Sequence, residues 1–322
     1  MFLGIDTSNY KTSVGLIDRE GKVLEDLRQP LSVPLGRPGL RQQEAVFQHL
    51  NNLPKLFQKL DGYNIKEELQ CVTATIRPRP VKDSYMPCFK AGEAFGKTVS
   101  AVLKIPFLSS SHQEGHLAAA FENSSLINEK RFLTFHLSGG TLEMLLIEDG
   151  ITLLGGTADI SFGQVLDRLG VLLGMEFPSG EELNNMALEE GEASSALKEI
   201  FIREGTVNLS GFDTQIQRVL KSKGIKESRV VKEVFNKIGD SIISLSSYYS
   251  QQTKTGNVLM TGGVSASSYL RKYIEERSCG KNMTFEFAKS HMSSDNGVGA
   301  AYLGRRLLWN KDPYPFQTLT DI

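Results

Sequence analysis

The chain has 322 residues, of which 40% are hydrophobic and 23% are charged, values that are ordinary for a globular protein. Its 36 basic and 37 acidic side chains nearly cancel. This balance excludes a strongly basic field for nucleic acid, so any RNA binding must come from a local patch or from partner proteins. The length predicts two lobes of about 150 residues each.

Cysteine usage and hydropathy predict where the protein works. Cys71, Cys88 and Cys279 show no paired spacing, which favours a reducing compartment over a disulfide framework. The N-terminus reaches Asp6 too soon for a signal peptide, and no run of 18 apolar residues is present. We therefore expect a soluble, cytoplasmic protein that does not enter a membrane.

The first third of the chain alternates between apolar runs with strand character and segments with helical spacing. Residues 2–18 predict two strands joined by a polar turn that is rich in hydroxyl groups and carries one carboxylate, Asp6. The elements expected after this hairpin are a helix over 44–60, a strand over 72–76, a helix over 91–103 and a strand over 105–108.

Two histidines four residues apart, His112 and His116, follow a serine-rich loop at residues 109–111. One turn of helix would place both imidazoles on the same face, where they could bind one metal ion. The motif differs from the protease pattern His-Glu-x-x-His because Glu114 occupies the third position. Two ligands do not complete a metal site, and a partly exposed helix with two histidines by chance is the alternative.

Two glycine turns further along the chain could bind a phosphate group. Residues 132–148 predict a strand, the turn Ser138-Gly139-Gly140-Thr141 and a second strand. Another turn, Thr261-Gly262-Gly263, precedes a predicted helix over 268–276. Backbone N–H groups in such turns can point at phosphate oxygens, although structural tightness alone also explains a single Gly-Gly turn.

Asp295 is the candidate for a third metal ligand. It lies in the polar loop 293–297, before a predicted apolar helix over 298–308. The alternative role for this residue is that of a helix N-cap. Together with His112 and His116 it predicts an open site of two imidazoles and one carboxylate, which suits zinc or iron(II).

The alternation of strands and helices predicts an α/β protein with mixed sheets. The order of the turns, first the one with Asp6, then Ser-Gly-Gly-Thr, then Thr-Gly-Gly, resembles the two-lobed actin, hexokinase and Hsp70 (ASKHA) fold with its duplicated sheets flanked by helices. We expect an N-terminal lobe of residues 1–113 plus 293–322, a second lobe of residues 114–292, and a cleft for ligand and metal between them.

A set of motifs, taken together, resembles the family of TsaD-type tRNA threonylcarbamoyladenosine transferases, formerly labelled O-sialoglycoprotein endopeptidases. The resemblance extends from Leu3 to about Leu308. Its motifs are Leu3-Gly4-Ile5-Asp6-Thr7-Ser8, His112-x-Glu114-Gly115-His116, Ser138-Gly139-Gly140, Gly156-Thr157-Ala158-Asp159, Asp167, Gly180, Ser210-Gly211, Thr261-Gly262-Gly263-Val264 and Asp295-Asn296.

The resemblance implies a reaction and its ligands. Such proteins pass a threonylcarbamoyl group from threonylcarbamoyl-AMP to the amino group of the tRNA adenosine next to the anticodon. By this resemblance His112, His116 and Asp295 would hold one divalent metal ion, iron or zinc, and an adenylate (threonylcarbamoyl-AMP, ATP or AMP) would be the ligand. We predict catalytic roles for Asp6 and Ser138. The residues that would contact the substrate or nucleotide are Ser138, Gly139, Gly140, Asp167, Gly180, Gly262, Gly263 and Ser267.

Several positions depart from the residues that are usual in the family. Asn9-Tyr10-Lys11-Thr12 stands where the family has Cys-Asp-Glu-Thr, so two carboxylates are absent and a cation is present. Thr141 replaces a histidine, Asp213 replaces a lysine and Ser267 replaces an asparagine. The metal-ligand candidates are kept while substrate-side groups are changed, which indicates a divergent paralogue.

The family's Gly-Pro-Gly loop is replaced here around Arg77-Pro78-Arg79-Pro80. Arg77, Arg79 and Lys82 form a positive cluster. Contact with RNA phosphate and a merely solvated loop both explain this cluster.

Three functions agree with these features. The leading one is a metal-assisted transferase that moves a threonylcarbamoyl or related carbamoyl group to tRNA. A carbamoyltransferase with a small-molecule acceptor is favoured by the absent carboxylates at residues 10 and 11. A catalytically silent nucleotide-binding subunit of a true TsaD-type enzyme is favoured by the changes at residues 141, 213 and 267. For partners we expect tRNA, bound through other proteins such as a TsaB-like subunit on the N-terminal lobe, and a homodimer as a further form.

Overall fold

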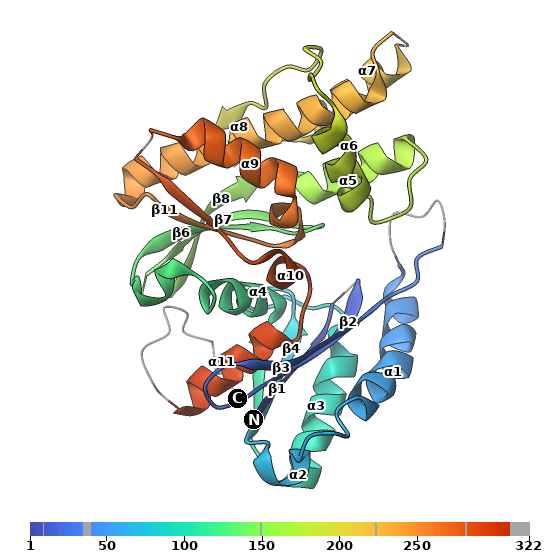
Figure 1. Cartoon of the computed structure of the whole chain (residues 1–322), viewed down its shortest axis with the longest axis vertical. Coiled ribbons are helices and arrows are strands. Elements are labelled where there is room, and N and C mark those ends of the chain that lie inside the picture. Colours follow the sequence, from blue (N-terminus) through green and yellow to red (C-terminus); the bar gives the residue numbers. More distant parts are fainter. Residues whose placement is uncertain (9, 35–39, 149, 223, 281, 310–322) are drawn as a thin grey trace. The chain divides into compact units, whose positions relative to one another are not determined.

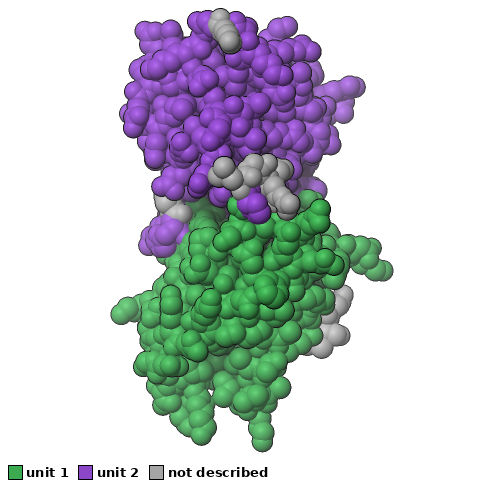
Figure 2. Space-filling view, turned by 90° about the vertical axis from the view of Figure 1, so that its right-hand side faces the viewer, with its two compact units in different colours: residues 1–33, 39–123, 292–322 green, residues 34–38, 124–291 purple. Residues whose placement is uncertain are grey.

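The computed structural model describes the chain except for residues 9, 35–39, 149, 223, 281 and 310–322. It contains two compact units (Figure 2). Unit 1 consists of residues 1–33, 39–123 and 292–322, and unit 2 consists of residues 34–38 and 124–291. Most of unit 2 is therefore inserted, along the chain, between two parts of unit 1. The C-terminal end of the lobe that we expected to reach residue 322 is described only to residue 309.

The first boundary between the units falls after residue 123, whereas we expected it after residue 113. Helix α4 (His112–Phe121) packs against α11 (Val298–Trp309) within unit 1. Their backbones approach closely, because a Cβ atom on Gly299 would lie 1.9 Å from the backbone oxygen of Gly115. A boundary at residue 113 would divide α4 and separate it from its packing partner.

Unit 1 is built on a mixed sheet with the strand order β3-β2-β1-β4-β5, in which β1 pairs antiparallel with β2 and parallel with β4. The strands are β1 (Phe2–Thr7), β2 (Lys11–Ile17), β3 (Val23–Pro30), β4 (Cys71–Arg77) and β5 (Phe107–Ser111). The further helices are α1 (Gln42–Gln58), α2 (Ile65–Glu68) and α3 (Phe89–Leu103), while α10 (Ser290–Ser293) lies where the chain returns from unit 2.

Side chains of β1 alternate between two helical layers, with α1 and α3 on one face of the sheet and α11 on the other (Figure 1). Leu3 and Ile5 belong to the apolar cluster shared with α1 and α3. Gly4 faces α11, where a Cβ atom would lie 2.4 Å from the backbone nitrogen of Ala301. Because successive residues of a strand point to opposite faces, Asp6 faces the same side as Gly4.

Unit 2 is built on a mixed sheet with the order β12-β11-β6-β7-β8-β10-β9. Figure 1 shows the long helix α8 beside α9, and the buried side of α8 joins the core cluster formed with the sheet. The strands are β6 (Phe132–Leu137), β7 (Leu142–Ile147), β8 (Ile151–Thr157), β9 (Ile202–Arg203), β10 (Thr206–Val207), β11 (Asn257–Thr261) and β12 (Thr284–Phe287). The helices are η1 (Ser125–Asn128), α5 (Phe162–Leu172), α6 (Gly180–Glu189), α7 (Ser210–Lys221), α8 (Glu227–Thr253), η2 (Gly263–Ala266) and α9 (Ser268–Ser278).

The strand expected over residues 105–108 differs from the structure, where β5 begins at Phe107 and extends to Ser111. The backbone of the three serines, which we expected in a loop, pairs with β4: Ala74 lies opposite Ser109, and Thr75 lies opposite Ser110. Their polarity did not prevent strand pairing, because the partner strand satisfies the backbone. Within the described part of the chain, every helix is too short or too polar to cross a membrane.

Candidate functional site

The metal-ligand candidates on α4 owe their position to a capping box at the start of this helix. The Ser111 hydroxyl accepts a hydrogen bond from the backbone N–H of Glu114 at 3.2 Å. In return, the Glu114 carboxylate accepts from the Ser111 backbone N–H at 2.7 Å and from its hydroxyl at 2.6 Å. The pair fixes the first helical residue as His112, so His116 lies one turn further on the same face. Glu114 therefore has a structural role between the two histidines.

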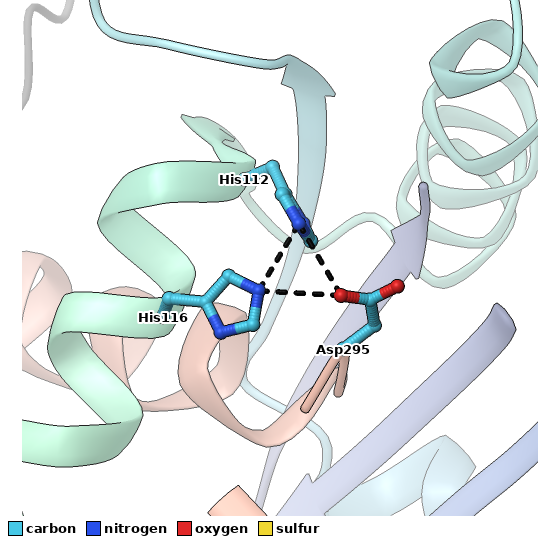
Figure 3. Close-up of side chains that lie close together, drawn as sticks. All are labelled: His112, His116 and Asp295. Carbon is cyan, nitrogen blue, oxygen red and sulfur yellow. Dashed lines mark hydrogen bonds and ion pairs between the residues drawn. The ribbon is translucent and has the colours of Figure 1, made fainter. Parts of the chain in front are cut away.

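Figure 3 shows His112, His116 and Asp295 pointing toward one another. The Nε2 atoms of the two histidines are 3.1 Å apart. One carboxylate oxygen of Asp295, Oδ1, lies 3.5 Å from Nε2 of His112 and 3.3 Å from Nε2 of His116. All three side chains belong to unit 1, and each is at least 84% buried.

The loop before α11 leaves the Asp295 side chain available for this cluster. The N-cap role that we considered for Asp295 is performed by Asn296, whose side-chain oxygen accepts from the backbone N–H of Gly299 at 3.0 Å. The amide group of Asn296 donates to the backbone oxygens of Met292 and Ser294 at 3.1 and 2.8 Å, which holds the loop in shape. The adjacent carboxylate is thus directed to the histidines.

Asp6 contacts the other side of His112. Its Oδ1 atom accepts a hydrogen bond from the Thr75 hydroxyl at 2.5 Å and lies 3.0 Å from Nδ1 of His112. A proton on Nδ1 that is donated to Asp6 leaves Nε2 facing the cluster, which is the arrangement that a metal-binding histidine needs. The second oxygen of Asp6 is buried and has no hydrogen-bond partner among the described residues.

The electrostatics of the cluster favour a positive charge at its centre. Burial alone would lower the pKa of His112, but the negative charges and hydrogen bonds of Asp6 and Asp295 raise it to about 10. Burial lowers the pKa of His116, and the charge of His112 lowers it further. For Asp295, burial is outweighed by hydrogen bonds and charges of both histidines, which hold its pKa well below its usual range. A metal ion would take the place of the proton on Nε2 of His112.

The donor set fits a divalent metal ion. Ligand atoms that bind zinc at 2.0–2.2 Å with tetrahedral or octahedral angles lie about 2.8–3.6 Å from one another, and the distances here are 3.1, 3.3 and 3.5 Å. Two imidazoles and one carboxylate suit zinc or iron(II) and leave coordination positions open. Among the described residues, these three side chains form the group of possible metal ligands whose donor atoms all lie within 4.8 Å of one another.

In unit 2, the turn Ser138–Thr141 joins β6 to β7. The backbone N–H of Ser138 donates to the oxygen of Thr141 at 3.0 Å, and the Ser161 hydroxyl donates to the oxygen of Gly139 at 2.7 Å. Gly163 allows α5 to approach this turn, because a Cβ atom there would lie 2.5 Å from the Cα atom of Gly139. Gly140 has open space where its side chain would be.

The third glycine turn is adjacent to the end of β6. Gly262 has a φ of +88°, and a Cβ atom on it would lie 2.4 Å from the backbone oxygen of Leu137. Leu137 directly precedes Ser138, so the two glycine turns lie next to each other within unit 2. Gly263 starts η2 and has open space at its Cβ position.

Asp167 and Gly180 are brought together by Ser179. The backbone of Ser179 donates a hydrogen bond to the Asp167 carboxylate, and Gly180 is the next residue and the first of α6. Burial raises the pKa of Asp167 to about 6, and the bond from Ser179 opposes this shift only in part. A carboxylate kept partly buried in this way can accept hydrogen bonds from ligand hydroxyl groups.

Ser267 caps α9 by accepting from the backbone N–H of Leu270 at 3.2 Å. Its hydroxyl donates to the side-chain oxygen of Asn184 at 2.7 Å, and the same oxygen accepts from the backbone N–H of Tyr269 at 3.0 Å. Asn184, on α6, thus holds the start of α9, the helix that follows the glycine turn Gly262-Gly263. Sequence reasoning missed it, since a single asparagine in a helix carries no readable signal.

Sequence reasoning also missed His49, which is buried on α1. Its Nδ1 lies 2.9 Å from the Thr12 hydroxyl, which also accepts from Asn52 at 3.1 Å. Burial lowers the pKa of His49 to about 4. This neutral histidine fixes the start of β2, close to the turn that follows Asp6.

A sequence model of TsaD, described as tRNA N6-adenosine threonylcarbamoyltransferase, matches residues 39–302, most of the chain. The chain belongs to the TsaD family. This confirms the resemblance and assigns the chain to a family of acyltransferases. Relatives with this family's name include that of Sulfurihydrogenibium sp. (strain YO3AOP1), which is 28% identical over 94% of this chain and 89% of its own length. The relative from Prochlorococcus marinus (strain MIT 9301) is 25% identical over 94% of this chain and 90% of its own length.

Solved structures confirm the ASKHA fold for this TsaD family member. HypF from T. kodakarensis has a TM-score of 0.62 and 14% identity, over 98% of this chain and 48% of HypF. Component A of (R)-2-hydroxyglutaryl-CoA dehydratase from Acidaminococcus fermentans has a TM-score of 0.55 and 14% identity, over 95% of this chain and 98% of component A. A ROK family glucokinase from Streptomyces griseus has a TM-score of 0.51 and 12% identity, over 95% of this chain and 99% of the glucokinase. At these identities the likeness establishes the fold alone.

The departures from the TsaD pattern occupy defined places. Asp213 is buried on α7, and its carboxylate lies 3.1 Å from Arg168, which compensates its charge within unit 2. Lys11 begins β2 and is half-buried. Thr141 directly precedes β7. Asn9 lies outside the described residues.

Proposed function

We propose that this protein transfers a threonylcarbamoyl group from an acyl-adenylate, such as threonylcarbamoyl-AMP, to the amino group of the tRNA adenosine next to the anticodon. The observation that carries the proposal is the convergence of donor atoms from His112, His116 and Asp295 within 3.5 Å in a member of the TsaD family. Names of the relatives supply the substrate class.

These three residues would hold one divalent ion, zinc or iron(II). When bound, the ion would supply a Lewis acid for the charge that develops on the carbamoyl oxygen. Three protein ligands leave room for substrate at the same ion. Asp6 acts through His112, because its hydrogen bond to Nδ1 keeps the ring in the orientation and tautomer that direct Nε2 into the site.

The transfer makes one bond and breaks one. The amino nitrogen of the adenosine bonds to the carbamoyl carbon and loses a proton, while the bond from this carbon to the phosphate oxygen breaks and AMP leaves with the electron pair. Backbone N–H groups of the turns at Gly139-Gly140 and Gly262-Gly263 would stabilise the phosphate. Asp167 would accept hydrogen bonds from ribose hydroxyls beside Gly180, and Ser138 would contact the acyl group.

The test begins with metal analysis of the purified protein and of His112→Ala/His116→Ala. We expect one equivalent of zinc or iron in the wild type and loss of this metal in the double variant. Both proteins are then incubated with threonylcarbamoyl-AMP, tRNA and the partner subunits of a characterised TsaD enzyme. We expect modified adenosine only with the wild type.

Other results would select the alternatives. Bound metal without transfer to tRNA would contradict the proposed acceptor and favour a carbamoyltransferase that acts on a small molecule. A protein that binds an adenylate but no metal would be the silent subunit. The intact donor set argues against the silent subunit, because a chain without chemistry does not need three converging ligands.

We also propose a partner subunit, of the TsaB-like kind, on helix α1 of unit 1. Phe47 and Leu50 lie one turn apart on this helix and are 68% and 44% exposed, which is unusual for large apolar side chains on one face. A homodimer is the alternative occupant of this face. The mass of the protein in solution, measured alone and with a TsaB-like subunit, distinguishes the two.

A further inference from the structure

The segment between β4 and α3 is attached to the first turn of the histidine helix. The backbone oxygen of Pro78 accepts a hydrogen bond from the backbone N–H of Gln113 at 3.0 Å. Gln113 follows His112 directly, and Arg77 is the β-sheet partner of Ser111. The segment therefore leaves the sheet beside the metal-ligand candidates.

Hydrogen bonds within this segment hold its backbone in a defined conformation. The backbone N–H of Ser84 donates to the oxygen of Val81 at 3.2 Å, and the N–H of Arg79 donates to the Ser84 hydroxyl at 3.0 Å. Asp83 adopts a left-handed φ of +67°. These contacts close residues 79–84 into a compact turn, and prolines 78 and 80 restrict its backbone further.

Arg77 belongs to the interior side of this segment, although the sequence grouped it with the other basic residues. Burial is the main cause that raises the pKa of Glu114, and the positive charge of Arg77 is one of the influences that oppose it. The charge of Arg77 therefore acts on the capping box of α4, and its Nε atom is buried. The cations left at the surface of the turn are Arg79 and Lys82, which are both exposed.

The turn also exposes two large apolar side chains. Tyr85 is 62% exposed and Val81 is 52% exposed. From residue 78 to residue 85 the only acidic side chain is Asp83. Exposed cations and an exposed aromatic ring within one short segment are the kinds of group that bind single-stranded RNA, because the cations contact phosphates and the ring stacks on a base.

We propose that residues 78–85, which we call the basic turn, bind the single-stranded RNA loop that carries the acceptor adenosine. The inference rests on the proposed function for the identity of the RNA. The attachment of the turn to Gln113 would keep the bound loop beside His112. A solvated turn explains the two cations but not the exposure of Tyr85, which directly follows the closed residues 79–84.

The test measures binding of an RNA hairpin, with an anticodon-loop sequence, to the full-length protein at several salt concentrations. We expect Arg79→Ala/Lys82→Ala to weaken binding more than about tenfold at low salt and to reduce the slope of log affinity against log salt by about 1.4, since each single-strand phosphate contact contributes about 0.7. Tyr85→Ala should weaken binding about 5- to 160-fold and leave the slope unchanged, since it removes one base stack.

The control variant is Lys55→Ala/Lys59→Ala, which removes two exposed lysines, one in the last turn of α1 and one directly after it. It should bind RNA like the wild type. Co²⁺ binding at the histidine cluster, measured for all variants, shows that α4 is intact. Equal RNA binding by the basic-turn variants and the wild type, or no RNA binding by the wild type, would overturn the proposal. RNA binding that depends on the turn, without threonylcarbamoyl transfer, would support the turn and contradict the proposed reaction.

Discussion

In unit 1 the candidate site is made of side chains that contact one another, whereas in unit 2 it is made of backbone turns and one carboxylate. His112 is held between Asp6 and Asp295, and the charges of these groups compensate one another. Asp167 of unit 2 has no such compensation, and its pKa is raised. The comparison teaches that unit 1 depends on the identity of its side chains, and unit 2 on backbone geometry that glycine permits.

The largest effect is expected for Asp295→Ala. It removes one of three converging ligands, so affinity for Zn²⁺ or Co²⁺ should fall by more than about 100-fold, beyond the 10- to 100-fold that loss of an outer-shell partner produces. Calorimetric titration with metal measures this loss. Asp61→Ala, which changes an exposed aspartate of the same unit, is the control, and equal affinities for the two variants would remove Asp295 from the site.

Gly262→Ala tests the backbone geometry of unit 2. The added Cβ atom would lie 2.4 Å from the oxygen of Leu137 at a φ of +88°, so we expect the free energy of unfolding to fall by about 2 kcal/mol or more. Denaturant titration measures it. Gly263→Ala is the matched control, because its Cβ meets nothing within 4 Å. If both substitutions had the same effect, the special geometry at Gly262 would be refuted.

Asp6→Asn separates the positioning of a ligand from the ligand itself. We expect metal affinity to fall about 10- to 100-fold and the absorption spectrum of bound Co²⁺ to change, because an amide no longer fixes the tautomer of His112. A purely structural role would change stability and leave the spectrum as it is. Thr75→Val, which removes only the hydroxyl bonded to Asp6, should have the smaller effect of the two.

The effect expected for Asp167→Asn depends on pH and disappears in acid. The pKa of Asp167 is about 6 in the folded protein, above its ordinary value of 3.8. The folded state therefore gains relative stability below pH 4 and loses it as pH rises through 6. We expect Asp167→Asn to raise the free energy of unfolding by roughly 1–3 kcal/mol at pH 8 and to weaken AMP binding. Glu181→Gln, at an exposed position, should change neither, and the stabilisation should vanish near pH 4.

The metal candidates were predictable from sequence because their spacing carries the information. His112 and His116 are one helical turn apart, and Ser111 and Glu114 form a capping box that can be recognised from the letters alone. The competing role of Asp295 as an N-cap could not be settled in advance, since Asn296 is an equally good cap. Only the hydrogen bond from Gly299 to Asn296 decides between them.

Contacts between distant residues could not be predicted. The bond from Thr75 to Asp6 depends on the parallel pairing of β1 with β4, and no local pattern specifies which strands become neighbours. The cap that joins Asn184 to Ser267 likewise depends on how α6 packs beside α9. Helix α8 was absent from the predicted elements, although Val230, Val234 and Ile238 recur with helical spacing and are buried. The family and the ASKHA fold were predicted from motif order and are confirmed.

The order of the units along the chain has a consequence for biosynthesis. The ribosome delivers all of residues 124–291 before it delivers α11 and Asp295. Until then β1, β2 and β4 lack the helix that covers one face of their sheet. His112 and His116 also lack the neighbouring carboxylate of Asp295. Unit 2 can fold while translation continues, but unit 1 is completed only after α11 has been made. A nascent chain that stops before α11 is therefore left with an uncovered face of this sheet and without Asp295, the third metal-ligand candidate.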